Sequence, residues 1–137
     1  MKPVIDDPIK YARETVGGDP LSKFLGIKIE EVREGYARVS LEVKPEYMNA
    51  VERAHGGIVY MVLDQAFAVG SNSRGVSAVA LAVTVNYLSG APAGSTIVAE
   101  ATPIETKRKV SVWKLEARTR EDGKIVATAT GTAYHQG

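Results

Sequence analysis

The sequence predicts an α+β domain in which one long helix packs against an antiparallel sheet. Three observations carry this prediction. An apolar run from Ile58 to Val69 has the length of a helix, two short β-type segments precede it, and four long β-type segments follow it. The chain has 137 residues, a length that suits one hydrophobic core, so we expect residues 1–137 to form a single domain.

The first 25 residues are expected to form two short helices. In each, an acid followed by proline marks the start and glycine marks the end. These signals are Asp7-Pro8 with Gly17 for the first helix and Asp19-Pro20 with Gly26 for the second. Residues 27–33 and 36–43 then alternate like strands around a turn at Gly35, and Pro45 ends the second strand.

The four long β-type segments after the helix cover residues 76–88, 95–106, 110–120 and 124–134. Because the connections between them are of hairpin size, they favour an antiparallel meander. In the first of these segments, alternate residues are bulky on one face and small or polar on the other. The small face therefore allows a helix or a ligand to approach closely.

Composition excludes several classes of function. Seventeen basic and sixteen acidic residues are well mixed and give a net charge of +1, so neither nucleic acid nor a membrane is an expected partner. Cysteine is absent, and the two histidines, His55 and His135, have no metal-ligand spacing, so no metal site or cofactor is expected. With no membrane-spanning run and no signal-peptide pattern, the expected location is cytoplasmic.

The start of the long helix is the first candidate site. Gly56-Gly57, directly after His55, permits a sharp start and a close backbone approach. The first turn of a helix presents unpaired amides and the positive end of the helix dipole. This segment therefore predicts a site for an anion or a carbonyl oxygen.

Asp64 is the second candidate. Between Ile58 and Val69 only Asp64 and Gln65 are strongly polar, a pattern typical of a helix enclosed by protein. A carboxylate in such a place has either a satisfying partner or a raised pKa, and both are frequent at reaction centres. The alternative is a structural aspartate that braces a neighbouring strand.

The spacing of the two candidates predicts a dimer. Gly57 and Asp64 lie on one face of the helix, roughly 10 Å apart along its axis at about 1.5 Å per residue. This distance is too large for both groups to act on one carbonyl. A second copy of the helix, running antiparallel in a two-fold dimer, would bring its Asp64 to this Gly57.

These residues, in this order, resemble those of the hotdog-fold acyl-CoA thioesterases of the phenylacetate-pathway (PaaI) type. The resemblance includes Asn49 before the helix, His55-Gly56-Gly57 to Asp64, and Asn86-Tyr87-Leu88-Ser89 after it, and it covers the chain after about Leu21. It implies a curved antiparallel sheet wrapped around a central helix. It also implies homodimers with active sites at the interface, and frequently homotetramers made of two such dimers.

The resemblance further implies hydrolysis of an acyl-CoA or aryl-acyl-CoA (phenylacetyl-CoA-like) thioester. Asp64 would act as general base or nucleophile, and the Gly57 amide would polarise the carbonyl. Asn49 would orient water or the carbonyl, with His55 hydrogen-bonded nearby. The alternatives are that His55 braces the loop against the helix and that Asn49 is a turn residue.

Substrate contacts are expected from Gly56, Gln65, Thr84, Arg74, Lys107 and Arg108. Some relatives carry a hydroxyl residue where this chain has Ala80, and Thr84 and Gln65 are the polar candidates to replace it. Lys107, Arg108 and Arg74 lie in loops that would meet the phosphates of coenzyme A, which is part of the substrate rather than a cofactor. Their alternative is a solvated hairpin tip.

Two other functions remain open at this stage. A non-catalytic acyl-CoA-binding module would use the same groove, but as a regulator it would need a DNA-binding helix pair. A hotdog enoyl-CoA hydratase would need an acid and a histidine close together in the helix, whereas His55 precedes it. A serine hydrolase is not expected, because Gly75-Val76-Ser77-Ala78-Val79 lacks the last glycine of a nucleophile elbow.

Overall fold

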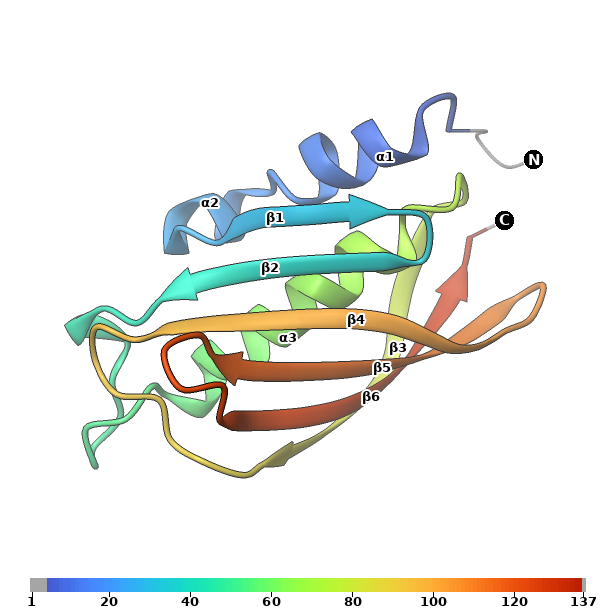
Figure 1. The fold of residues 1–137 in the computed structure, drawn as a ribbon. Helices are drawn as coiled ribbons and strands as arrows, with labels where there is room; N and C mark the ends of the chain where they lie inside the picture. The colour runs from blue at the N-terminus through green and yellow to red at the C-terminus, as the bar shows by residue number, and fades with distance from the viewer. Residues whose placement is uncertain (1–4, 137) are drawn as a thin grey trace.

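A six-stranded antiparallel sheet curves around helix α3 (Gly56–Ser71) in the computed structural model, which describes residues 5–136 (Figure 1). The strands are β1 (Lys28–Arg33), β2 (Tyr36–Glu42), β3 (Ala78–Tyr87), β4 (Thr96–Thr106), β5 (Val110–Thr119) and β6 (Ile125–His135). Their order in the sheet is β1-β2-β4-β5-β6-β3. The expected α+β class, with one long helix against an antiparallel sheet, is confirmed.

The position of β3 differs from the predicted meander. β4, β5 and β6 follow one another as predicted, but β3 pairs with β6 at the far edge, and β4 pairs with β2. Residues 89–94 therefore cross the end of the sheet instead of forming a hairpin. A connection's length limits which strands can pair but does not choose among them. Here α3 crosses the sheet and carries the chain from β2 to the opposite edge.

The N-terminal helices lie where they were predicted. Helix α1 (Pro8–Lys10) continues as the π-helical turn η1 (Tyr11–Val16), and α2 (Pro20–Leu25) follows. Asp7 and Asp19 cap α1 and α2, since each side chain accepts a hydrogen bond from a backbone N–H three residues later, at 3.1 and 3.0 Å. The predicted helical region began at residue 1, and residues 1–4 lie outside the described residues.

The core lies between α3 and the concave face of the sheet. Phe67 of α3 and Trp113 of β5 are both almost fully buried, with ring centroids 6.4 Å apart. Gly70 allows this close packing, because a Cβ there would lie 3.2 Å from Trp113 Cζ3. Packing of this face fixes the rotation of α3, so that the stripe carrying Gly57 and Asp64 points away from the sheet.

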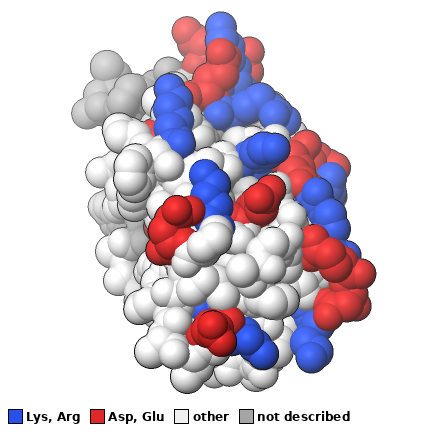
Figure 2. Space-filling view, turned by 90° about the vertical axis from the view of Figure 1, so that its left-hand side faces the viewer, with Lys and Arg blue, Asp and Glu red and all other residues white. Residues whose placement is uncertain are grey.

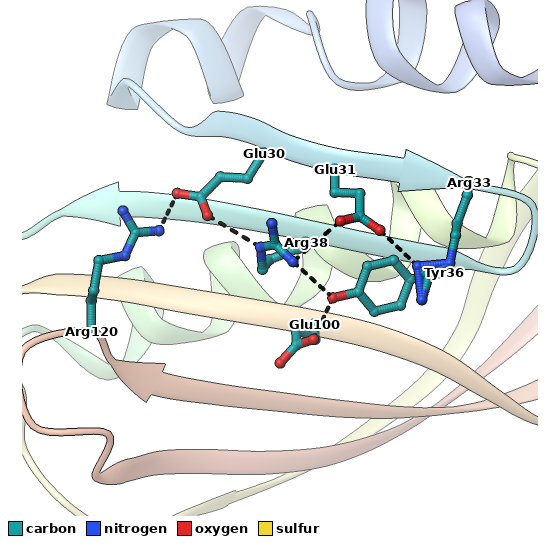
Figure 3. Close-up of polar contacts among 7 residues, drawn as sticks. All are labelled: Glu30, Glu31, Arg33, Tyr36, Arg38, Glu100 and Arg120. Carbon is teal, nitrogen blue, oxygen red and sulfur yellow. Dashed lines mark hydrogen bonds and ion pairs between the residues drawn. The ribbon is translucent and has the colours of Figure 1, made fainter.

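The outer face of β1, β2 and β4 carries a polar network (Figure 3). Arg38 is at its centre, with Nε 3.3 Å from Glu30 Oε1 and Nη1 3.4 Å from Glu31 Oε1. The network also contains Arg33, Tyr36, Glu100 and Arg120. The charges of this network are thus paired locally. Figure 2 shows acidic and basic side chains intermixed toward the top and right of the face it presents, whereas its left side is largely uncharged.

A bilayer-crossing segment would need a long, apolar helix, and the helices within residues 5–136 do not meet both conditions.

Candidate active site

Backbone hydrogen bonds hold the loop that leads into α3. The N–H of His55 donates to the carbonyl of Tyr47 at 2.8 Å, and the N–H of Ala54 donates to the carbonyl of Ala91 at 2.8 Å. At the first residue of α3, the Gly56 carbonyl accepts a hydrogen bond from the Tyr87 hydroxyl at the end of β3, at 3.0 Å. The start of α3 is therefore tied to three separate segments of the chain.

His55 caps α3. Its Nδ1 accepts a hydrogen bond from the Gly57 N–H at 3.0 Å, which makes Nε2 the protonated nitrogen of the neutral ring. This contact braces the loop against the helix, which is the alternative to a direct catalytic role for His55. The same bond occupies the amide that the sequence assigned to the carbonyl, so a substrate must compete with His55 for it.

Asn49 braces the loop before α3. Its Oδ1 accepts hydrogen bonds from the backbone N–H groups of Val51 and Arg53, both at 3.0 Å. These bonds form a side-chain-stabilised turn, which is the alternative considered for this residue. The carbonyl oxygen of the side chain is thereby engaged, and its NH2 group is the part able to meet a substrate.

Asp64 is half-buried on the stripe of α3 that faces away from the sheet. The apolar sequence of α3 had indicated a helix enclosed by protein on all sides. Gly57 and Tyr60 on the same stripe are exposed, so this face of the helix is open. Burial raises the pKa of the Asp64 carboxyl above its usual range, and the carboxylate of Asp19 raises it further. The pKa of Tyr60 is raised by its own burial and then by Asp64.

Asp64 opens onto a hollow of about 360 Å³. Three segments form its walls: one stripe of α3, the first residues of β3, and the N-terminal turn η1. The other lining residues are Tyr11, Val16, Phe67, Ala68, Ser71, Asn72, Ser77, Ala78, Val79 and Ala80. Within residues 5–136 no group of three or more histidine, aspartate or glutamate side chains is arranged to hold a metal ion.

None of the six predicted substrate contacts lines this hollow. Gln65 is only 1% exposed, and its Nε2 donates to the carbonyl of Val16 at 3.0 Å, so it ties α3 to η1. Thr84 is exposed on β3 opposite Thr130. Ala80, by contrast, does line the hollow, so the position that lacks a hydroxyl belongs to the site.

The predicted phosphate-binding residues gather beyond the C-terminal end of α3. Arg74 and Lys107 line one hollow of about 190 Å³. Arg74 Nη1 donates to Thr106 Oγ1 at 2.9 Å, and its guanidinium lies over the Trp113 ring, 5.7 Å from the centroid. Arg108 is exposed in the adjoining β4–β5 turn.

Sequence reasoning missed the contribution of Tyr11 and Val16 to the Asp64 hollow. More than forty residues separate them from Asp64, and no spacing rule connects positions so distant. The one available signal was an aromatic residue on a short helix with an apolar side.

Comparison with known proteins places these features in a family. A model of the thioesterase superfamily matches residues 52–126. The acyl-coenzyme A thioesterase PaaI of Escherichia coli is 34% identical over 119 residues, covering 87% of this chain and 84% of that protein.

Solved structures agree with this match. The PaaI protein from the phenylacetic acid degradation operon of E. coli superposes with a TM-score of 0.90 at 30% identity, covering 98% of this chain and 97% of the other. A hypothetical thioesterase from Streptococcus pneumoniae with coenzyme A superposes with a TM-score of 0.83 at 26% identity, covering 91% of this chain and 97% of that one.

Proposed function

Because this chain belongs to the thioesterase superfamily, we propose that it hydrolyses acyl-CoA or aryl-acyl-CoA thioesters to the free acid and CoA. The observation that carries the proposal is Asp64, a half-buried carboxyl at the mouth of a hollow, on the helix that begins with Gly56-Gly57. The similarity to a PaaI acyl-CoA thioesterase and to a thioesterase solved with coenzyme A supports this substrate class.

Asp64 acts in this proposal on water or directly on the thioester carbonyl. A carboxylate whose pKa is raised by burial is a stronger base than an ordinary one. A thioester has a good leaving group, so a base of this strength is sufficient. As general base, Asp64 takes a proton from water while the water oxygen attacks the carbonyl carbon. The C–S bond of the tetrahedral intermediate then breaks, and the proton passes from Asp64 to the leaving thiolate, which releases CoA and restores the carboxylate.

The Gly57 amide stabilises the oxyanion in this proposal. Its N–H has an acceptor in His55 Nδ1, and the substrate oxygen replaces that acceptor when it develops negative charge. One such donor contributes about 3 kcal/mol to transition-state stabilisation in related sites. In this proposal Asn49, in the loop before α3, offers its NH2 group to the substrate.

A dimer is proposed because one subunit holds the two groups too far apart. Gly57 and Asp64 are separated by roughly 10 Å along α3. Strand β3 is an edge strand with exposed apolar side chains: Val79 is 43% exposed and Leu81 60%. Antiparallel pairing of β3 with its copy would set two α3 helices side by side in opposite directions, with Asp64 of the partner subunit near Gly57.

The same dimer gives the basic residues beyond α3 a role as contacts of the CoA phosphates. Arg74, Lys107 and Arg108 lie beyond the end of α3, and Gly57 to Ser71 spans about 21 Å of helix at about 1.5 Å per residue. An extended pantetheine arm, with about 13 bonds from its sulfur to the first phosphorus, covers roughly 16 Å of this length at about 1.25 Å per bond, so it carries the phosphates toward this end of α3. One subunit thus supplies Gly57 and the phosphate contacts, and its partner supplies the base. Pairing of two dimers into a homotetramer and a cytoplasmic location complete the proposal and stay predictions.

Release of free thiol tests the proposed reaction. Phenylacetyl-CoA, a hydroxybenzoyl-CoA and acyl-CoAs of short, medium and long chain are each incubated with the protein and a colorimetric thiol reagent. Because the chain has no cysteine, the protein itself gives no signal. Release from at least one substrate is the expected result. Binding of these esters without any release would instead identify a non-catalytic binding module.

A mixture of two inactive variants tests whether the site is shared between subunits. Asp64→Asn removes the base, and Gly57→Pro removes the amide N–H at a helix start, where proline is tolerated. If the groups act across the interface, a re-equilibrated mixture contains heterodimers with one intact site and recovers about a quarter of the wild-type rate. If both groups act within one subunit, the mixture stays inactive.

A further inference from the structure

We infer that the N-terminal segment Pro8–Val16 forms the outer wall of the acyl-binding pocket and that Tyr11 limits the length of the acyl group. The inference rests on the proposed function, because it identifies the hollow beside Asp64 as the place of the acyl chain. It adds a specificity-determining residue and a substrate class, apolar acyl groups of up to about eight carbons, the length derived below.

The walls of the hollow define a channel along α3. Asp64, Phe67, Ala68 and Ser71 are spaced three or four residues apart, so they form one stripe that leads from the carboxyl toward the C-terminal end of the helix. Ala78–Ala80 of β3 form a second wall. Tyr11 and Val16 close the third side, which the sheet leaves uncovered.

The polar side chains at the far end of this channel are already hydrogen-bonded. Asn72 Nδ2 donates to the carbonyls of Ala68 and Ala78 at 2.8 and 3.1 Å, and its Oδ1 accepts from the Ala78 N–H at 2.9 Å. The Ser77 hydroxyl donates to Gln136 Oε1 at 3.0 Å. The rest of the channel wall is hydrocarbon from Val16, Phe67 and the alanines of the lining, Ala68, Ala78 and Ala80. An apolar acyl chain therefore fits better than a polar one.

The N-terminal segment is held in place at both ends and in the middle. Gly75, just beyond α3, lies against Pro8, since a Cβ on Gly75 would be 3.5 Å from Pro8 Cγ. At the other end Gln65 Nε2 donates to the carbonyl of Val16 at 3.0 Å. Between them Ala12 is fully buried beside Val69. The segment therefore runs antiparallel to α3, and Tyr11 lies over the part of the channel beyond Asp64.

The length of the channel sets the expected substrate. Asp64 to Ser71 spans about 10 Å at about 1.5 Å per residue. An extended hydrocarbon chain advances roughly 1.25 Å per carbon, given C–C bonds of about 1.5 Å. The channel thus takes about eight carbons, or an aryl-acetyl group, before Tyr11 and Ser71 obstruct a longer chain.

The test compares chain-length profiles of three variants with the wild type. Values of kcat/KM are measured for butanoyl- to hexadecanoyl-CoA, and the affinities of the same esters are measured in an Asp64→Asn background. Tyr11→Ala is expected to raise the dodecanoyl-to-hexanoyl ratio by about tenfold, the effect of one or two methylenes in an apolar pocket. Tyr11→Trp, which keeps an aromatic ring on the segment, is expected to shift the preference toward shorter chains.

Arg13→Ala is the matched control, because Arg13 lies on the same turn, is exposed and does not line the hollow. It is expected to keep the wild-type profile. Wild-type profiles in both Tyr11 variants, with thiol release intact, would overturn the role of Tyr11 and leave the proposed reaction standing. Failure of the wild type to release thiol from any ester would overturn the proposed function and this inference with it.

Discussion

Replacing Gln65 by leucine separates a structural from a substrate-binding role for this residue. Gln65 Nε2 donates to the carbonyl of Val16, and the side chain is 1% exposed. The Val16 carbonyl also accepts from the Asp19 N–H at 3.3 Å, so Gln65→Leu does not leave it without a partner. The net loss is therefore that of one ordinary hydrogen bond, about 1 kcal/mol of unfolding free energy.

For a domain of this size, a loss of 1 kcal/mol lowers Tm by about 3–5 °C. Thermal unfolding followed by circular dichroism measures this shift, and kcat on a short acyl-CoA is expected to stay within about threefold of wild type, the span of less than 1 kcal/mol. Gln65→Met is the matched control, because it removes the donor but keeps an unbranched side chain, and it should show the same shift. An unchanged Tm together with a tenfold loss of kcat would contradict the structural role and indicate that Gln65 contacts the substrate.

Three further predictions concern Asp64, the sheet and the dimer. Asp19→Asn keeps the cap of α2 but removes a negative charge that raises the pKa of Asp64. Because the ionised base then persists to lower pH, the acid limb of the kcat/KM profile should move to lower pH, and an unmoved limb would contradict this. Burial acts to raise the pKa of Glu30, but hydrogen bonds from Arg120 and its other neighbours hold it below its usual range. Urea unfolding should therefore show wild type to be about 1 kcal/mol more stable than Glu30→Gln at pH 7, and this difference should disappear as the pH falls below about 4.3. A difference that stays constant from pH 7 to 3 would argue against the pairing of Glu30 with the arginines. Leu81→Lys places a charge on the exposed β3 edge and is expected to halve the mass measured by light scattering, with a loss of about 10²-fold in kcat; wild-type mass and rate would rule out the β3 interface.

The elements of the fold could be predicted because each has a local cause. The acid-proline starts fix the short helices, and the apolar run after Gly56-Gly57 fixes α3. The partner of β3 could not be predicted, because strand pairing depends on where α3 delivers the chain. That path is a property of the packed core around Phe67 and Trp113 and not of the 89–94 connection.

The candidate site was predictable in part for the same reason. Asp64 stands out as a carboxylate in an apolar helix, and the structure gives it a hollow and a raised pKa. Gln65 was grouped with it because it is polar and adjacent, yet successive helical residues point about 100° apart, and Gln65 turns toward Val16. The contact of Tyr11 with the Asp64 hollow exists only once the N-terminal segment has docked on α3.

The decisive experiment on Asp64 as the catalytic base compares thiol release from one acyl-CoA substrate by wild type and by Asp64→Asn, measured side by side. Asparagine keeps the shape of the side chain and removes the base, so the variant should have the wild-type mass. Its Tm should be at least that of wild type, because burial disfavours the charge that the substitution removes. Rapid thiol release is expected from wild type, with a loss of at least about 10²-fold in the variant. Equal rates from a correctly folded Asp64→Asn protein would contradict this role of Asp64.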